Sequence, residues 1–303
     1  MRVAVTGSRG LIGSALVTAL QADGHDVTRV VRGHPGRANV AWDPAKGRIG
    51  ADGLEGVDAV VHLAGVGIGD HRWTREHKRA VLDSRVQGTT LLAQALAGLS
   101  RPPSVLASAS AVGFYGDRGD EILTEASGPG SGFLTEVVEQ WEASTRAAED
   151  AGVRVAHLRS GVVLSPEGGA LKPQLLPFKL GLGGRIGTGR QWWSWISIDD
   201  EVGAIRHVLA DGSSLRGPVN LTAPAPVTNA EFAKALGRVL GRPTLLPVPV
   251  PALKVAFGSE MVEEMFLSGQ RVVPERLLES GYRFRHADLE GALRDLLGRP
   301  AQG

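Results

Sequence analysis

The sequence predicts an α/β fold, a doubly wound parallel sheet with a smaller, irregular C-terminal lobe. Short β-branched runs alternate with segments of helical apolar spacing through the first half of the 303 residues. This alternation is typical of parallel strands joined by crossover helices. A glycine-rich turn joins the first strand to the first helix. After Leu164 the sequence becomes dense in Gly, Pro and Leu, which indicates a change of architecture.

The first thirty-two residues have the order strand, glycine turn, helix, strand. Arg2–Thr6 is a β-branched run, the next segment has helical apolar spacing up to Gly24, and Val27–Val31 is a second apolar run. In this context the glycines permit a tight turn, a close approach to a pyrophosphate and close helix–sheet packing. We therefore predict a dinucleotide-binding Rossmann unit, although a tight turn without a ligand is the alternative. The predicted cofactor contacts are Gly7, Ser8, Arg9, Gly10, Leu11, Ile12 and Gly13.

The end of the second strand indicates which dinucleotide is bound. NAD-binding folds usually place an acid there to hold the ribose 2′-hydroxyl, whereas an Arg accommodates the 2′-phosphate of NADP. Here the strand ends at Val31 and Arg32, no acid lies between Asp26 and Asp43, and Arg9 stands inside the glycine turn. The two cations favour NADP(H) as the cofactor, although either Arg alone could be an ordinary surface charge.

The alternation of strands and helices continues to about residue 160. Strands are expected at Val40–Trp42, Asp58–Gly65, Val105–Ala109 and Arg154–Leu158, and helices at Thr74–Leu99 and Leu134–Ala151. Ligands of parallel sheets lie beyond the carboxyl ends of the strands. Leu63, Ala64 and Gly65 are therefore expected to line the cofactor cleft.

The second half has sparser signals. Residues 165–190 suit an irregular lobe or lid. Later elements are expected at Glu201–Leu209 (helix), Gly217–Thr222 (strand), Phe232–Leu240 (helix, after a capping box from Thr228 to Glu231), Tyr282–Phe284 (strand) and Leu289–Leu297 (helix). We therefore expect an NADP-binding domain at residues 1–164, with its sheet completed by about residues 195–222. A substrate lobe would be formed by residues 165–194 and 223–303.

Composition excludes several classes of function. The 33 Lys and Arg balance 32 Asp and Glu, for a net charge of +1, so bulk charge predicts neither a nucleic-acid partner nor a membrane surface. The absence of Cys excludes disulfides and thiolate chemistry. The sequence begins on a strand without an apolar leader, and no apolar run reaches the length of a membrane span. We expect a cytoplasmic protein with a small-molecule substrate and no metal site.

Several long motifs carry a family resemblance that covers nearly the whole chain. They are the TGSRGLIG turn, the tripeptide Trp42-Asp43-Pro44, DAVVHLAG from Asp58, LRSGVVLSPEGG from Leu158, LPFKLGLGGRIGTGRQWWSWISIDD from Leu176 and GQRVVPERLLESGYRFRHADLEGAL from Gly269. The sequence resembles the extended short-chain dehydrogenase/reductase superfamily of NAD-dependent epimerases and dehydratases, in an atypical branch with a C-terminal domain of unknown function. The resemblance implies further cofactor contacts at Arg85, Ser108, Arg159, Gly161 and Val162.

The resemblance fails at the catalytic pair of that superfamily. Its oxidoreductases use a Ser together with a Tyr and a Lys four residues apart, and the Lys lowers the pKa of the proton-transferring Tyr. Here Phe133 and Val137 occupy the pair, although the serine is present as Ser108 or Ser110. Tyr115 could act as acid or base, or could only line the site. Ser110 could polarise a substrate carbonyl, or could be a turn serine.

Two functions therefore stay open. The first is an NADP(H)-dependent oxidoreductase or epimerase in which Ser110 and Tyr115 are catalytic. The second is a non-catalytic NADP(H)-binding sensor. The group Trp192, Trp193 and Trp195 could line a substrate pocket or could pack beneath the lobe, and Arg185 and Arg190 could meet a substrate anion or be surface charges.

Overall fold

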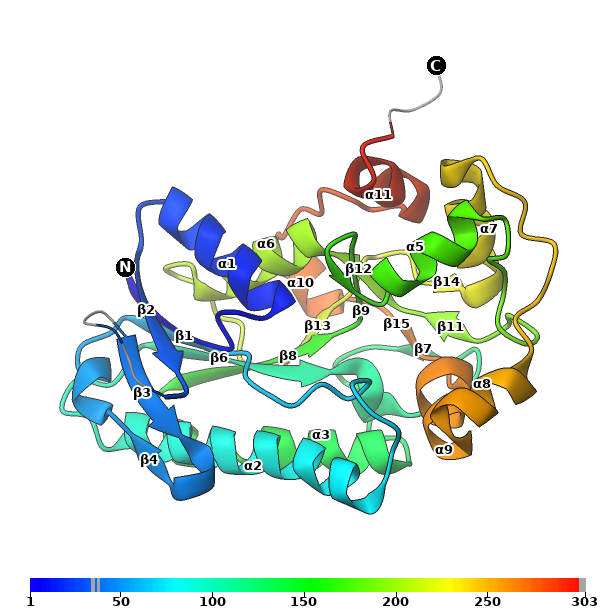
Figure 1. Ribbon diagram of the computed structural model, residues 1–303. Coiled ribbons are helices and arrows are strands. Elements are labelled where there is room, and N and C mark those ends of the chain that lie inside the picture. The colour runs from blue at the N-terminus through cyan, green and yellow to red at the C-terminus, as the bar shows by residue number, and fades with distance from the viewer. Residues whose placement is uncertain (34–35, 37–38, 300–303) are drawn as a thin grey trace.

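A single eight-stranded sheet runs through the centre of the molecule (Figure 1). The computed structural model describes residues 1–33, 36 and 39–299, so the last four residues of the predicted lobe lie outside it. From one edge to the other the strands are β13 (Gly217–Leu221), β8 (Arg154–Ser160), β6 (Val105–Ala111), β5 (Ala59–His62), β1 (Arg2–Thr6), β2 (Asp26–Val31), β3 (Asn39–Asp43) and β4 (Arg48–Ile49). All neighbours are parallel except β3 and β4. The predicted parallel sheet is confirmed.

The strand order reverses at β1, which lies between β2 and β5. The chain builds outward from β1 to β4, returns to place β5 on the other side of β1, and continues outward to β13. Thr6, the last residue of β1, is level with Val30 of β2 and His62 of β5. The carboxyl ends of these strands therefore meet where the order reverses, and open α/β sheets bind their ligands at this place.

Helices cover both faces of the sheet (Figure 1). Alternate residues of β1 divide between the two faces, because Val3 and Val5 join the core on one side and Ala4 joins the core on the other. This is the period of two expected of a strand buried on both faces. The doubly wound arrangement is thus confirmed. One face carries α1 (Leu11–Ala22), α6 (Ile198–Leu209) and α10 (Glu275–Glu279), and the other carries α2 (Arg75–Ala97), α3 (Phe133–Ala143) and α4 (Arg146–Asp150).

Small strands and helices after β8 surround a second apolar core. Trp195, Phe232, Leu236 and Leu293 are buried in it. The strands are β9 (Val162–Ser165), β10 (Gly168–Gly169), β11 (Trp192–Trp193), β12 (Trp195–Ser197), β14 (Val227–Thr228) and β15 (Arg271–Val272), which pairs with β7 (Ile122–Leu123). The helices are α5 (Lys172–Lys179), α7 (Asn229–Leu240), α8 (Val250–Phe257), α9 (Ser259–Val262), the π-helix η4 (Glu263–Leu267) and α11 (Leu289–Leu296). Short 3₁₀-helices are η1 (Pro44–Lys46), η2 (Ala51–Leu54) and η3 (Val112–Tyr115).

Three elements differ from the sequence expectations. Residues 165–190 are not wholly irregular, because β10 and α5 lie within them. The helix expected at Leu134–Ala151 is divided into α3 and α4, and the Thr145 hydroxyl at the break donates to the Glu142 carbonyl (2.8 Å). Tyr282–Phe284 forms no strand, because its two aromatic rings instead pack edge to face with centroids 4.9 Å apart, against the core beneath α6.

Two smaller expectations agree with the structure. The capping box is present at the start of α7, where the Thr228 side chain accepts from the Glu231 backbone N–H and the Glu231 carboxylate accepts from the Thr228 N–H. Such a pair satisfies two N–H groups that the helix itself leaves free. None of the helices in the described ranges is long and apolar enough to cross a membrane.

The Asp200 carboxylate, in the first turn of α6, holds the C-terminal segment against the sheet. It is 1% exposed and accepts the backbone N–H groups of Arg285 (2.7 Å) and His286 (2.9 Å). The hydroxyls of Tyr282 (3.2 Å) and Ser197 (2.9 Å) also donate to it. A buried carboxylate is tolerated only with such partners, so this group fixes the path of the chain between α10 and α11.

We predict that Asp200→Ala lowers the free energy of unfolding by about 3 kcal/mol or more, because it leaves several buried donors unpaired. The matched control is Asp199→Ala, next to it on the more exposed side of α6, where the carboxylate lies 3.7 Å from the Arg285 guanidinium. That change should cost less than about 1 kcal/mol. Urea unfolding of the two variants measures the difference, and equal losses would contradict the anchoring role.

Candidate functional site

A cleft of about 570 Å³ opens at the carboxyl edge of the sheet, where the strand order reverses. Its walls come from four connections and one helix. They are the turn after β1 (residues 7–10), the end of β2 (30–32), the end of β3 and the start of η1 (42–45), the loop after β5 (63–66), and three residues of α2 (Asp83, Ser84 and Gln87). The cleft therefore combines segments distant in sequence that the parallel topology brings to one edge.

The glycine turn is shaped for close approach. Gly7 has φ of +63°, and a Cβ there would lie 2.6 Å from the carbonyl carbon of Leu63. A Cβ on Gly13 would lie 2.2 Å from the carbonyl oxygen of Gly7, so helix α1 can approach the turn only with glycine at this position. Gly10, the N-cap of α1, has no side chain to cap the helix. The first N–H groups of α1 are thus free of intrahelical partners and carry the positive end of the helix dipole.

A buried hydrogen-bond network of Thr6, His62 and Thr89 lies beneath the cleft and holds the loop after β5. The Thr6 hydroxyl accepts the backbone N–H groups of Leu63 (3.0 Å) and Ala64 (3.2 Å). Its own proton therefore points to His62 Nδ1 at 2.8 Å, and His62 Nε2 donates to Thr89 Oγ1 at 3.0 Å. Burial lowers the pKa of His62 to about 4, so the ring is neutral. His62 is a structural histidine in this arrangement.

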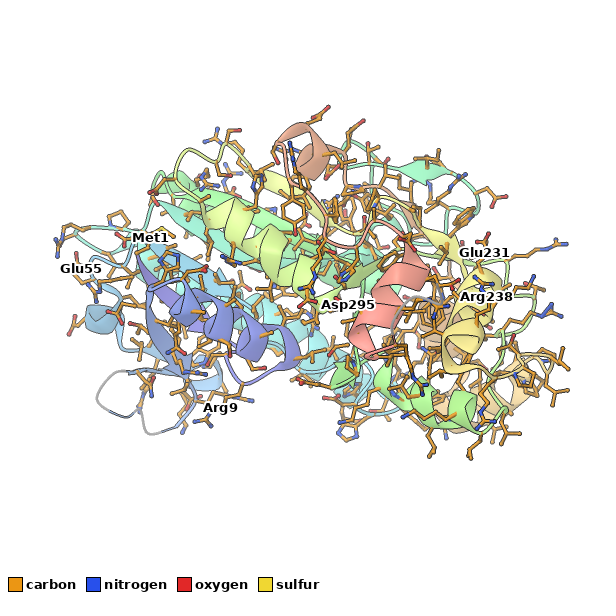
Figure 2. All side chains as sticks on the ribbon, turned by 90° about the horizontal axis from the view of Figure 1, so that it is seen from above. Met1, Arg9, Glu55, Glu231, Arg238 and Asp295 are labelled. Atoms are coloured by element: carbon orange, nitrogen blue, oxygen red, sulfur yellow. The ribbon has the colours of Figure 1, made fainter. Side chains whose placement is uncertain are left out.

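The two predicted cations, Arg9 and Arg32, both line the cleft and are exposed. Figure 2 shows Arg9 at the periphery of the molecule. Neither forms an ion pair with any described residue. Among the acids that line the cleft, Asp43 lies 3.3 Å from Lys46 of η1. Asp83, the other acid of the cleft wall, lies 3.5 Å from Arg79. Both acids therefore have a cationic partner, and the charges of Arg9 and Arg32 are left unpaired among the described residues.

Arg85 of α2 acts from behind the cleft wall. It is 7% exposed, and its guanidinium donates to the carbonyls of Val66 (2.9 Å) and Val81 (3.1 Å). The guanidinium also lies over the Trp141 ring at 4.9 Å. Burial lowers the pKa of Arg85 to about 10, which leaves the group charged at neutral pH. Arg85 thus ties the loop after β5 to α2.

The predicted catalytic residues lie in an internal polar network. Ser110 donates to the Glu142 carboxylate at 2.6 Å, and Arg159 makes two hydrogen bonds of 2.8 Å to the same group. Arg159 also donates to the Tyr115 hydroxyl (3.1 Å), which itself donates to Asn220 (2.7 Å). Tyr115 is fully buried, and Ser110 is 5% exposed. Neither side chain lines the cleft, and their catalytic roles stay predictions.

The charges of this network are fixed by pairing. Burial alone would raise the pKa of Glu142, but the hydrogen bonds and charge of Arg159 outweigh it and hold that pKa below its ordinary value. Burial raises the pKa of Tyr115 although Arg159 opposes this. At neutral pH the network therefore contains an ionised Glu142, a charged Arg159 and a neutral phenol.

Phe133, at the position of the missing catalytic Tyr, packs against other side chains, and the backbone N–H groups at the start of its helix are capped. Phe133 begins α3, where its ring meets Trp73 at 5.0 Å and Lys78 Nζ at 4.4 Å. The Glu264 carboxylate of η4 accepts the backbone N–H groups of Phe133 and Leu134 at 2.9 Å each. A segment 131 residues further along the chain thus supplies the N-terminal cap of α3.

Other predicted contacts lie apart from the cleft wall. Ser108 is buried, with no hydrogen-bond partner for its hydroxyl among the described residues. Gly161, between β8 and β9, lets the Ser194 carbonyl approach, because a Cβ on Gly161 would lie 2.1 Å from that oxygen. Val162 donates its backbone N–H to the same carbonyl at 2.7 Å. Leu11 and Ile12 lie in the first turn of α1, next to the cleft residue Gly10.

The tryptophan group is largely a packing feature. Trp195 is fully buried and donates its indole N–H to the Ala225 carbonyl (2.9 Å), and Trp193 packs against Phe232 with centroids 4.9 Å apart. Trp192 is partly exposed and donates to Asp120 at 2.7 Å. Trp193 and Trp195 therefore support the alternative in which the tryptophan group packs beneath the lobe.

One carboxyl beside β8 is buried with a single donor. Glu201 of α6 is 1% exposed and accepts the Ser160 hydroxyl at 2.6 Å, while its other oxygen has no partner among the described residues. Burial raises the pKa of Glu201 to about 8. The side chain is therefore protonated at neutral pH.

Part of the cleft wall is not predicted by the sequence patterns. Trp42, Asp43 and Pro44 belong to a family motif without a predicted role, and Ser84 and Gln87 of α2 also line the cleft. The spacing of three between Ser84 and Gln87 puts them on one face of a helix, and this is the signal that could have identified them. No sequence pattern indicates that the Thr6 hydroxyl holds the loop after β5.

Family comparison agrees with this geometry. Residues 3–221 match the model of the NAD dependent epimerase/dehydratase family. The chain belongs to that family. Residues 248–296 match a second model, a domain of unknown function numbered DUF1731. The family match covers the cleft wall and the sheet apart from Arg2 at the start of β1, and the second match covers α8 to α11 completely.

Individual relatives are similar over almost the whole length of this chain. An epimerase family protein of Mycobacterium bovis is 46% identical over 299 residues, which cover 98% of each chain. The crystal structure of human epimerase family protein SDR39U1 with NADPH has a TM-score of 0.90 at 39% identity and covers 98% of this chain and 99% of that chain. A nucleoside-diphosphate sugar epimerase of Corynebacterium glutamicum has a TM-score of 0.82 at 40% identity, and this chain spans 58% of its length.

We predict that Thr6→Val lowers the free energy of unfolding by about 1–3 kcal/mol, because it leaves two backbone N–H groups and His62 without their shared partner. Thr18→Val is the matched control, because its hydroxyl lies on the exposed face of α1 and only donates to a helix carbonyl. The control should change stability by less than about 0.5 kcal/mol. Thermal and urea unfolding measure the two losses of stability. Equal losses would contradict the structural role of the Thr6 hydroxyl.

We predict that Glu201→Gln removes part of the pH dependence of stability. The folded state keeps the Glu201 proton up to a pKa of about 8, whereas the unfolded chain releases it near 4.5. The free energy of unfolding of the native protein should therefore fall, by up to roughly 1.4 kcal/mol per pH unit, as the pH rises from 5 to 8. Gln retains the acceptor for Ser160 and carries no charge. Urea unfolding at pH 5.5, 6.5 and 7.5 should show the variant gaining on the native protein, and parallel curves would refute the assignment.

Proposed function

We propose that this chain binds NADP(H) in the cleft and acts on a small substrate as an oxidoreductase or epimerase. The observation that carries the proposal is the cleft itself, in which a glycine turn, an uncapped helix start and two unpaired cations face the reversal point of the sheet. The human relative was solved with NADPH, and its similarity over the whole chain supports the same cofactor here.

The residues present fit such a cofactor. Gly7 and Gly10 leave room for the backbone to approach a pyrophosphate, and the start of α1 offers N–H groups and a positive dipole. Arg9 and Arg32 would bind the 2′-phosphate. An acidic cleft end, or one whose cations were already paired with acids, would not attract this phosphate. Leu63, Ala64 and Gly65 would form the apolar wall below the cofactor.

The remaining predicted contacts would act at a distance from the phosphates. Arg85 would hold the loop after β5. Ser108 lies within β6 and Arg159 near the end of β8, and Gly161 and Val162 follow β8. The nicotinamide half would extend toward these residues. Bound nicotinamide would supply hydride transfer to or from a substrate carbon. The protein would orient the substrate and exclude water beneath the C-terminal segments.

In an enzyme, side chains of the internal network would carry out catalysis. Ser110 would bind the substrate oxygen and Tyr115 would move the proton, in place of the residues lost at Phe133 and Val137. Both hydroxyls are occupied within the internal network, so this chemistry would require the network to open toward the nicotinamide end.

That occupation favours a second candidate function. A non-catalytic NADP(H) sensor would use the cleft in the same way and would keep Ser110 and Tyr115 as structural groups. An oxidoreductase consumes NADPH and a sensor does not, and this difference is directly measurable. An epimerase returns the hydride to its substrate and consumes no cofactor overall.

We predict that the protein binds NADPH more tightly than NADH, and that Arg32→Ala weakens NADPH binding by about tenfold or more with little effect on NADH. Titration followed by nicotinamide emission measures both affinities. Arg146→Ala, which removes an exposed cation of α4 that is not part of the cleft wall, is the control and should leave both affinities unchanged. Equal affinity for the two cofactors would overturn the roles of Arg9 and Arg32, and no binding of either would overturn the proposed function.

We predict slow NADPH oxidation with one or more members of a panel of small carbonyl compounds, and a loss of kcat of at least about 100-fold in Tyr115→Phe with unchanged NADPH affinity. The unfolding temperature of the variant is measured in parallel, because the change also removes a partner of Asn220 and Arg159. Equal rates in both proteins would exclude Tyr115 as the proton donor. Background rates in both, with NADPH bound, would exclude the oxidoreductase and leave the sensor or a redox-neutral epimerase.

A further inference from the structure

Positive and negative side chains are distributed unevenly along the chain, although the net charge is only +1. Residues 168–198 and 232–259 together contain eight Lys and Arg and no Asp or Glu. The rest of the chain carries the other 25 cations and all 32 acids, for a net charge of −7 against +8 in the two stretches. Balanced bulk charge therefore does not describe the surface of this protein.

The two basic stretches lie side by side at one end of the molecule. The Val248 N–H donates to the Arg185 carbonyl at 2.7 Å, and Ile186 and Val248 form a β-bridge. A Cβ on Gly184 would lie 1.9 Å from the Leu246 carbonyl oxygen. Figure 1 shows α5, α7 and α8 at the end opposite β3 and β4, and Figure 2 shows Arg238 of α7 at the end opposite Glu55.

Most of these cations are exposed and lack an acidic partner. Arg238 pairs with Glu290 and Lys254 pairs with Glu263. The other six form no ion pair within the described ranges, and each is exposed. They are Lys172, Lys179, Arg185, Arg190, Lys234 and Arg242.

Solvent-exposed leucine side chains lie at the same end of the molecule as the basic stretches. Five of them are more than 60% exposed, and α8 adds Val255 at 78%. Elsewhere in the described chain the large apolar side chains that are exposed reach at most 55%, at Ile122. We call this surface the leucine tip, and its leucines are Leu176, Leu180, Leu182, Leu245 and Leu246.

We propose that the leucine tip docks onto an anionic lipid bilayer without spanning it. Exposed Leu side chains can enter the interfacial zone of a membrane, and Lys and Arg around them are attracted to anionic headgroups. Single-stranded nucleic acid would use the cations but would gain little from leucines, because base recognition relies on aromatic stacking. The combination of bare leucines and unpaired cations, with no carboxylate in either stretch, therefore matches an anionic membrane surface.

Docking at the tip leaves the cleft available. The cleft wall is formed by residues 7–87 and the tip by residues 172–255, with no residue in common. The proposal is therefore independent of cofactor binding, and tip variants should keep the NADPH affinity of the native protein.

The test is co-sedimentation of the full chain with sucrose-loaded vesicles of phosphatidylcholine, with and without 30% phosphatidylglycerol as the anionic lipid. Binding is expected only to the anionic vesicles and should weaken when salt is raised to 0.5 M. Leu245→Ser combined with Leu246→Ser should weaken it at least tenfold, and Lys179→Glu combined with Arg242→Glu should do the same. Leu278→Ser and Arg146→Glu, both outside the tip, are the matched controls and should bind as the native protein does.

Several results would overturn the proposal. No binding to anionic vesicles, or equal binding to neutral ones, would exclude an anionic lipid surface. Binding that depends on the cations but not on the leucines would mean simple charge attraction, and retention by a single-stranded oligonucleotide insensitive to the leucine changes would assign the surface to nucleic acid. Circular dichroism of each variant ensures that lost binding is not lost folding.

Discussion

The close approach of the turn after β1 to the loop after β5 is the constraint on which the rest of the site depends. Gly7 has no Cβ because the Leu63 carbonyl occupies that space, and the Thr6 hydroxyl ties the same loop down through two backbone N–H groups. His62 completes this arrangement as a neutral ring whose pKa burial lowers to about 4. The cleft is consequently a rigid edge of the sheet rather than a surface loop.

Much of the fold follows from local sequence patterns. The β-branched runs, the glycine turn and the spacing of α1 predict the doubly wound parallel sheet and the cleft wall at Gly7 to Gly10 and Leu63 to Gly65. These features depend on residues close together in the chain and on rules of handedness and packing that hold for all such sheets. The family model agrees with them over residues 3–221.

The polar interior could not be predicted in the same way. Glu142 meets Ser110 and Arg159, and Tyr115 meets Asn220, which is 105 residues away. Such partners are set by tertiary contacts that no spacing rule encodes. The hydroxyls of Ser110 and Tyr115 look available in the sequence because the groups that occupy them are distant. The division of the chain at residue 164 stays a prediction, since the C-terminal segments are anchored to α6 by Asp200 and to α3 by Glu264.

The cap that Glu264 places on α3 has a consequence for biosynthesis. Helix α3 starts at Phe133, yet the carboxylate that satisfies its first N–H groups is translated 131 residues later. A nascent chain that has emerged only as far as the main sheet therefore presents an α3 with a bare start. The native hydrogen bonds of this helix are completed only after the π-helix η4 has left the ribosome, so the final step in forming this part of the protein is post-translational or nearly so.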